Sequence, residues 1–234
     1  TFHTGDAFAE KYGMTHVHRS DGICHQLMTE AGYVKPGNIA FGTDSHTTTY
    51  GCVGAFSSGI GYTEMASILG TGTMWIKVPE TIKVVIEASC RKNVMSKDII
   101  LRLIGDLGAD GATYRALEFS GNTVENMTVA SRMTIANMAI EAGGKNGIFP
   151  VDEKTIEYLK EHSKRDFKVY EADPDAEYDE EYTIDLSELK PTVSFPHLPE
   201  NTKTIDEITE PVTIDQAVIG SCTNGRIDDL RVAA

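Results

Sequence analysis

The spacing of apolar positions in the middle of the chain predicts a strand followed by a helix. Residues 82–88 (Ile-Lys-Val-Val-Ile-Glu-Ala) are mostly β-branched and partly alternate with polar residues, which is typical of a strand. Residues 97–107 carry apolar side chains three and four positions apart, which predicts a helix capped by Ser96. The apolar positions of this helix are Ile99, Ile100, Leu103, Ile104 and Leu107. We expect this stripe to be buried and the helix to pack on the strand.

Two further helices are predicted after this unit. Met133 to Ala142 has a helical pattern that Gly143-Gly144 is expected to end, because glycine readily adopts the left-handed conformation found at helix ends. Asp152 is expected to cap a third helix, in which Ile156 and Leu159 face inward. Strands that alternate with helices in this way predict an α/β fold.

The composition changes in the last third of the chain. Seven acidic residues fall between positions 171 and 181 with no Lys or Arg among them, which is typical of a solvated face or loop. Four prolines then indicate a linker from Lys190 to Pro211. Residues 212–219 (Val-Thr-Ile-Asp-Gln-Ala-Val-Ile) are predicted to form a strand that ends at the turn Gly220-Ser221-Cys222. Residues 226–231 are predicted to form the first turns of a helix.

These changes divide the chain into three zones. Residues 1–79 are rich in His, Gly and Thr and are expected to form part of a first α/β domain. Residues 80–190 are expected to form a second α/β domain, and residues 191–234 a linker and the start of a third. The chain begins without an initiator Met and stops within the last predicted helix, so we expect it to lack both ends of a longer protein.

Composition and charge limit the classes of partner. The 234 residues are 41% hydrophobic and 24% charged, which is close to the average for globular proteins. The 35 acidic and 21 basic residues give a formal net charge of −14, so neither nucleic acid nor anionic lipid is an expected partner. No export signal or long apolar run is evident, and we expect a soluble cytoplasmic protein. The four widely spaced cysteines are expected to be free thiols.

The first polar motif is Asp44-Ser45-His46. Neighbours in sequence cannot reach one another in the geometry of a hydrolase triad, but a tight turn can present all three to one pocket. A simple capping turn is the alternative, since Asp and Ser favour helix starts. The following glycines do not complete a dinucleotide-binding fingerprint, because Glu64 stands where the third glycine is needed. Close backbone packing is the better explanation of Gly59 and Gly61.

Further candidates are histidines and one carboxylate. His16, His18 and His25 are close enough in sequence for a zinc site, with solvated or core histidines as the alternative. Asn137 and Glu141 are four residues apart and project from one face of the predicted helix. The rest of that face is apolar, and an unpaired buried carboxylate is unfavourable, so we expect Glu141 to have a histidine partner. An exposed Glu at the helix edge is the alternative.

Cys222 lies at the predicted carboxyl end of a strand, where parallel sheets place ligands. The pattern is compatible with a nucleophile and with a ligand of a metal cluster. Together with three other motifs in the same order, this turn resembles the aconitase family over nearly the whole chain. The four motifs are Gly22-Ile23-Cys24-His25-Gln26, Gly42-Thr43-Asp44-Ser45-His46-Thr47, Ile135-Ala136-Asn137-Met138 through Glu141, and Gly220-Ser221-Cys222-Thr223-Asn224-Gly225-Arg226.

Within that family the chain is most similar to the large subunits of two-subunit dehydratases that act on isopropylmalate. Large subunits that act on homoaconitate or methyl-substituted malates are very similar. The resemblance implies three-layer α/β domains and a 4Fe–4S hydro-lyase, in which three cysteines hold the cluster and one iron binds the substrate. It assigns Cys222 as a cluster ligand, His25 with Asp44 and His46 with Glu141 as catalytic pairs, Ser45 as a substrate contact, and Asn137 and Asn224 as neighbours of the cluster.

The resemblance also implies two partners, a separate small subunit and a hydroxy-dicarboxylate or hydroxy-tricarboxylate substrate. Only Cys222 lies in a cluster motif, and one thiolate cannot hold a cubane. We therefore expect the 4Fe–4S cluster in the full-length enzyme, and neither a cluster nor activity in this chain alone. Cys222 is expected to be a free thiol near a poorly packed terminus. A non-enzymatic iron-sensing or RNA-binding relative and a zinc hydrolase are the alternatives from other classes.

Overall fold

A four-stranded parallel sheet forms the centre of the computed structural model, which describes residues 2–234. The strand order is β5-β4-β3-β6, so the predicted strand, β3, is an inner strand. Its side chains alternate between buried and half-buried, with Ile82, Val84 and Ile86 in the core. The strands span Thr81–Glu87 (β3), Ala116–Ser120 (β4), Asn146–Ile148 (β5) and Glu180–Asp185 (β6).

Helix α4 (Ser96–Leu107) confirms the first predicted helix. Ile99, Leu103 and Ile104 are buried and belong to the same core as β3, as expected. The helix packs mainly against α6 (Val129–Asn137), η2 (Met138–Ala142) and the strand β7 (Thr192–Ser194). Ser96 does not cap it, because the preceding residue, Met95, is the cap and its amide donates to Asp98 Oδ2 at 2.7 Å. The Asp98 carboxylate, three residues on, thus satisfies the amide of the cap residue.

The second and third predicted helices are also present. The second begins earlier than expected, because Thr128 accepts a hydrogen bond from the amide of Ser131 and caps α6. Its last turn is the 3-10 helix η2, which Gly143 ends at a φ of +85°. Asp152 caps α7 (Glu153–His162) by accepting from the amide of Thr155. The inward-facing positions of α7 are buried or half-buried, as the pattern predicts.

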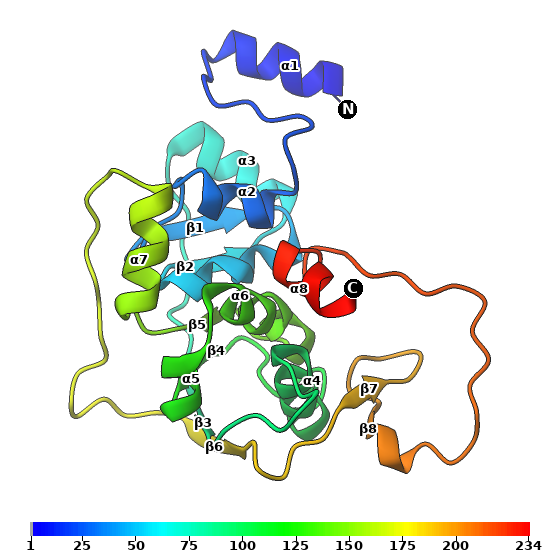
Figure 1. The fold of residues 1–234 in the computed structure, drawn as a ribbon. Helices are drawn as coiled ribbons and strands as arrows, with labels where there is room; N and C mark the ends of the chain where they lie inside the picture. The colour runs from blue at the N-terminus through cyan, green and yellow to red at the C-terminus, as the bar shows by residue number, and fades with distance from the viewer. Residues whose placement is uncertain (1) are drawn as a thin grey trace.

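The N-terminal residues add a second, two-stranded parallel sheet. It pairs β1 (Ile39–Gly42) with β2 (Phe56–Gly59), joined by the buried 3-10 helix η1 (Ser45–Val53). Because η1 packs against α6 and β5, the two sheets share one hydrophobic core. The division into zones at 79 and 190 stays a prediction. The remaining N-terminal helices are α1 (Phe2–Lys11), which extends away from the body, α2 (Cys24–Glu30) and α3 (Tyr62–Thr71) (Figure 1).

The acidic segment 171–181 exposes its carboxylates, as expected for a solvated face or loop, although a strand was not predicted there. Its end forms β6, which pairs with β3 at the edge of the sheet. Of the six residues in β6 only Ile184 is buried, so the sequence of this strand lacks the alternation of apolar and polar residues that predicts a strand. Arg115 also neutralises part of the run, since it pairs with Asp179 at 3.1 Å and Glu180 at 2.9 Å.

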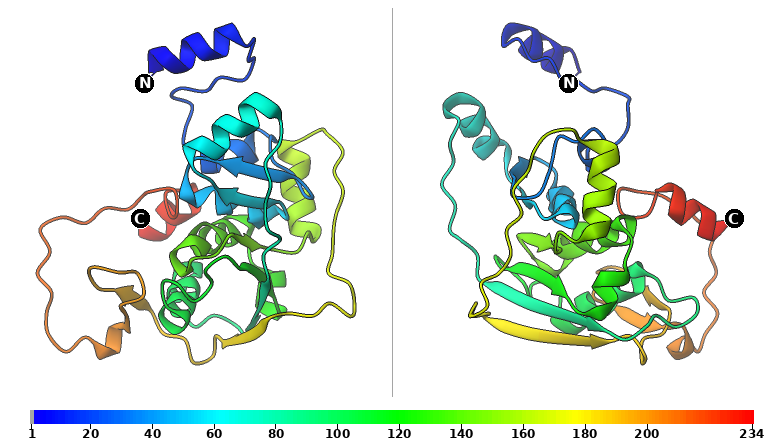
Figure 2. Two further views of the ribbon diagram at one scale, coloured as in Figure 1. Left: turned by 180° about the vertical axis from the view of Figure 1, so that it is seen from behind. Right: turned by 60° about the vertical axis from the view of Figure 1, so that its left-hand side comes forward.

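The C-terminal third departs further from expectation. The predicted linker contains a small antiparallel hairpin, β7 (Thr192–Ser194) with β8 (Thr202–Thr204), followed by η3 (Ile205–Glu207). Residues 212–219 are not a strand, because within residues 2–234 no neighbouring strand offers hydrogen bonds to their backbone. They run as an exposed connection that returns the chain to α8 (Ile227–Ala233), the expected final helix (Figure 2).

None of the helices described over residues 2–234 has both the length and the apolar character needed to cross a lipid bilayer.

Candidate active site

The Asp44-Ser45-His46 motif lies just beyond the carboxyl end of β1, where η1 begins. Asp44 caps η1, since its Oδ1 accepts a hydrogen bond from the amide of His46 at 2.8 Å. A capping turn is therefore present, and it also fixes the directions of the Ser45 and His46 side chains. The end of β2 packs closely on this turn, because a Cβ on Gly59 would lie 2.8 Å from Ser45 Cα. Close packing, rather than nucleotide binding, explains that glycine.

His25 pairs with Asp44. His25 lies on α2 and is only 3% exposed, and its Nε2 is 2.8 Å from Asp44 Oδ1. Burial lowers the pKa of His25, although the carboxylate opposes this effect. Burial also tends to raise the pKa of Asp44, but the hydrogen bonds from the His46 amide and from His25 outweigh it, so this pKa lies below its usual value. The pair therefore combines a neutral imidazole with an ionised carboxylate near pH 7.

His46 pairs with Glu141; the apolar helix face predicted a histidine partner, and the family resemblance assigned His46. Their side chains meet at 2.8 Å, between Nε2 and Oε1, although 95 positions separate them. The hydrogen bond to Glu141 raises the pKa of His46 above its usual value, against the effect of partial burial. The second oxygen of Glu141, Oε2, is buried and has no partner in the described part of the chain. His46 is thus the histidine that holds a proton more firmly.

The two pairs form one group. The rings of His25 and His46 lie 6.3 Å apart, and Asp44 binds the side chain of one and the amide of the other. Two titratable groups whose environments move their pKa values in opposite directions are typical of an acid and a base in one site. The arrangement can deliver a proton from His46 and accept one at His25.

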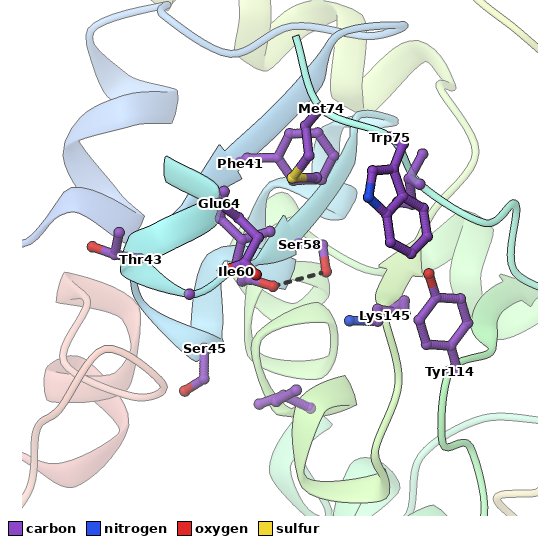
Figure 3. A pocket seen from close by; sticks show the side chains of 14 residues that line it. Phe41, Thr43, Ser45, Ser58, Ile60, Glu64, Met74, Trp75, Tyr114 and Lys145 are labelled. Carbon is purple, nitrogen blue, oxygen red and sulfur yellow. Dashed lines mark hydrogen bonds between the residues drawn. The ribbon is translucent and has the colours of Figure 1, made fainter. Parts of the chain in front are cut away.

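Ser45 borders a cavity next to these pairs. Its Oγ lies 3.2 Å from His46 Nδ1, and it lines a cavity of about 530 Å³ between β1, β2 and the segment after α3 (Figure 3). Apolar side chains such as Trp75 form much of the lining. Lys145 supplies a cation, 4.8 Å from the Tyr114 ring. A hydroxy acid with an apolar substituent is compatible with such a lining.

Asn137 connects these pairs to Cys222. Asn137 is completely buried, and its Nδ2 donates to Thr49 Oγ1 at 2.9 Å and to Cys222 Sγ at 3.5 Å. Its Oδ1 accepts from the hydroxyl of Thr223 at 2.7 Å. The Thr49 hydroxyl in turn donates to the carbonyl of His46 at 2.6 Å. A continuous set of hydrogen bonds therefore joins the Cys222 thiol to the backbone of His46, a member of one histidine–carboxylate pair.

Two expectations for the Cys222 region need correction or refinement. Cys222 does not follow a strand but lies in a turn between an irregular segment and α8. Asn224 bonds to Thr134 and Asp229 rather than to the thiol, so it anchors the turn. All four cysteines are free, as expected, and Cys222 is half-buried.

The three early histidines do not come together as a zinc site. Both His16 and His18 contact the hydroxyl of Tyr33, at 3.3 and 2.8 Å, whereas His25 faces Asp44. Residues 2–234 contain no group of three His, Cys, Asp or Glu side chains placed to hold a metal ion. The zinc hydrolase alternative therefore lacks its site in the described residues.

Cys24, His25 and Asp44 are not a thiol triad either. Cys24 Sγ is 3.8 Å from both ring nitrogens of His25, so neither nitrogen is directed at it. Burial, followed by the charge of Asp44, raises the pKa of Cys24, which disfavours the nucleophilic thiolate.

Arg226 is a site residue that reasoning from single motifs missed. It is 8% exposed and donates to the carbonyls of Cys222 and Thr223. Its position directly after Asn224-Gly225 was the available signal, but nothing local shows that its side chain turns back.

The matches to known proteins agree with this geometry. The sequence pattern of the aconitase family (aconitate hydratase) matches residues 2–234, and the chain belongs to that family. It is 58% identical over 229 residues to the "3-isopropylmalate dehydratase large subunit" of Caldicellulosiruptor saccharolyticus, covering 97% of this chain and 53% of the relative.

Two other relatives are about as similar. The protein of the same description from Acetivibrio thermocellus is 60% identical over 213 residues, covering 91% of this chain and 51% of the relative. The "2,3-dimethylmalate dehydratase large subunit" of Eubacterium barkeri is 58% identical over 213 residues, with the same two shares. The chain thus spans about half the length of the curated relatives it matches.

Proposed function

We propose that these residues form part of the large subunit of a 4Fe–4S hydro-lyase. Its reaction is the interconversion of 2-isopropylmalate and 3-isopropylmalate by dehydration and rehydration, a step of leucine biosynthesis in the cytoplasm. The observation that carries this proposal is the meeting of two histidine–carboxylate pairs beside Cys222. The 58–60% identity to large subunits of this description gives independent support.

In this proposal each side chain has a distinct role. His46, whose pKa is raised by Glu141, donates the proton to the leaving hydroxyl, and Glu141 stabilises the charged imidazole. His25 stays neutral because it is buried, and Asp44 fixes its tautomer and orientation. Ser45 binds the substrate at the edge of the cavity.

Cys222 is proposed as one thiolate ligand of the cluster. The thiol is half-buried and accepts a hydrogen bond from the Asn137 amide, which suits a thiolate sulfur. When bound, a 4Fe–4S cluster supplies a Lewis-acidic iron for the substrate hydroxyl. Residues 2–234 place one of the three thiolate ligands that the cluster requires, and no group of three ligands comes together in them. We therefore infer that the chain by itself retains no cubane. Anaerobic reconstitution that leaves about four irons and four sulfides per chain after desalting would contradict this inference.

A chimera tests the function itself. Residues 1–234 replace the matching segment of the Caldicellulosiruptor saccharolyticus large subunit, which is then reconstituted with iron and sulfide and mixed with its small subunit. We expect conversion of isopropylmalate. We also expect His46→Gln to lower kcat by about 10²–10⁴-fold, the usual contribution of a general acid. A folded, cluster-containing chimera that is inactive on isopropylmalate, dimethylmalate and homoaconitate would exclude the hydro-lyase proposal.

The second candidate is a 2,3-dimethylmalate dehydratase, because the relative of that description is as similar as the isopropylmalate relatives. Both substrates are malates with apolar substituents, so the same catalytic pairs serve either reaction. Relative kcat/KM of the chimera on the two acids decides between them. The net charge of −14 disfavours a non-enzymatic RNA-binding role. A measured, salt-dependent affinity for RNA would support that role instead.

A further inference from the structure

Arg226 encloses the turn that carries Cys222. Its Nη1 donates to the carbonyl of Thr223 at 2.6 Å, and its Nη2 donates to the carbonyl of Cys222 at 3.2 Å. Nη1 also lies 3.3 Å from the hydroxyl of Thr134 on α6. A single planar guanidinium thus holds two successive carbonyls of the turn against the helix that carries Asn137.

Asn224 also anchors the turn through Thr134 and Asp229, and the Thr134 hydroxyl donates to the Thr223 carbonyl at 3.1 Å, but the elements on either side of the turn add little packing. The segment before it forms no strand, and no residue of α8 after it is buried. Ser221, directly before Cys222, has a φ of +71°, which is an unfavourable conformation for a residue with a side chain. Such a conformation persists only where surrounding contacts impose it.

The setting of Arg226 differs from that of a surface arginine. Its closest carboxylate, that of Asp229, is 3.9 Å from Nη1, so the backbone carbonyls are the main partners of the buried charge. Arg226 is only 8% exposed, and enclosing a charged guanidinium is unfavourable by itself. The contacts with the turn offset this unfavourable burial.

We propose that Arg226 is a positioning residue that fixes the Cys222 thiol beside Asn137. Its guanidinium holds the carbonyls of Cys222 and Thr223, and without it the turn opens and the thiol moves away from α6. This inference extends the proposed function, because it explains how one cluster ligand is presented. It concerns the position of the thiol, which can be measured without a cluster.

The test is the rate at which Cys222 reacts with N-ethylmaleimide at pH 7. The 234-residue chain carries Cys24→Ser and Cys90→Ser, which remove the two exposed thiols. Cys222 lines a cavity of about 450 Å³ and is accessible to the reagent, whereas Cys52 is completely buried and reports general unfolding. Labelling at each cysteine is followed by mass spectrometry.

We expect Arg226→Met to accelerate labelling of Cys222 about tenfold while Cys52 stays unlabelled. Tenfold corresponds to about 1.4 kcal/mol of easier opening. Arg226→Met removes the hydrogen bonds to the carbonyls of Cys222 and Thr223, so a faster reaction at Cys222 reports an opened turn. Arg226→Lys keeps the charge but not the planar fork, and we expect a smaller acceleration.

The matched control is Arg231→Met. Arg231 also lies beside an aspartate, at 3.0 Å from Asp228, but is exposed on α8, and its loss should leave the labelling rate unchanged. Three outcomes would overturn the proposal: an unchanged or slower rate in Arg226→Met, an equal acceleration in Arg231→Met, or a parallel acceleration at Cys52. Because no cluster or substrate is involved, each of these outcomes leaves the hydro-lyase proposal to be judged by the chimera alone.

Discussion

Replacing Arg132 by methionine should destabilise the protein more than any substitution of a surface arginine. Arg132 lies on α6, three residues before Ile135 and five before Asn137, and is completely buried. Its guanidinium binds both carboxylate oxygens of Asp152, and Nη1 donates to the hydroxyl of Thr155 at 3.0 Å. The residue therefore fastens the helix that carries Asn137 to the start of α7.

The expected cost follows from what the substitution leaves unpaired. Removal of one partner of a buried ion pair typically costs about 3–5 kcal/mol. The Asp152 side chain is 28% exposed and water can reach it, which places this case at the lower end. The carbonyls of Val124 and Pro150 also lose their donor, at 2.9 and 3.2 Å, which adds to the cost. We expect a loss of about 3–4 kcal/mol, or roughly 10 °C in Tm for a chain of this size.

Urea unfolding followed by circular dichroism measures this loss, and Arg102→Met is the matched control. Arg102 forms an i,i+4 pair with Asp106 on α4 at 2.5 Å, but its side chain is 51% exposed, so its loss should cost less than about 0.5 kcal/mol. A cost below about 1.5 kcal/mol for Arg132→Met, with an unchanged m value, would refute the reasoning.

The ion pair also predicts a dependence on pH. Partial burial tends to raise the pKa of Asp152, but the hydrogen bonds from Arg132 and from the Thr155 amide outweigh it, so its pKa in the folded state lies below 3.8. The resulting stabilisation is present above pH 3.8 and is lost as the pH falls through the folded-state pKa. Arg132→Met should therefore show a smaller loss of stability on acidification than the parent chain.

Two further predictions concern the site. Glu141→Gln should lower the pKa of His46, measured by NMR titration, and an unchanged pKa would show that Glu141 does not raise it. The substitution should also remove a stabilisation of the fold that is present below pH 6.5 and is lost as the pH rises through the raised folded-state pKa of His46. Gly59→Ala should destabilise the fold by about 1–3 kcal/mol, because the new methyl group meets the backbone of Ser45 at 2.8 Å. Gly5→Ala is the control for this substitution, since its methyl group meets nothing within 4 Å.

Several parts of the fold could be predicted because their signals are local. The helix around Leu103 follows from apolar residues three and four positions apart, since this spacing forms one face whatever the helix later packs against. Asp152 as a cap follows from the unpaired amides of a first helical turn, which need an acceptor close in sequence. The partner of Glu141 could be predicted as a histidine from the cost of burying a lone carboxylate.

The failures have the opposite origin. Residues 212–219 have a strand pattern but form none, because a strand requires a neighbour to bind its backbone. β6, in which three of six residues are acidic, forms because β3 offers such a neighbour. The zinc site considered for His16, His18 and His25 does not form, because His25 faces Asp44, although both other histidines are nearer to it in sequence.

The sequence by itself thus determined the periodic helices, their caps, the α/β class and the motifs of the site. Only the tertiary structure decided which strands pair, that the assigned histidines and carboxylates lie within hydrogen-bond distance, and that Arg226 turns back on Cys222. The physical reason is the separation in sequence between the groups that interact. Helical periodicity and capping depend on residues within a few positions, whereas strand pairing and buried polar contacts depend on groups that folding brings together from distant parts of the chain, such as His46 and Glu141.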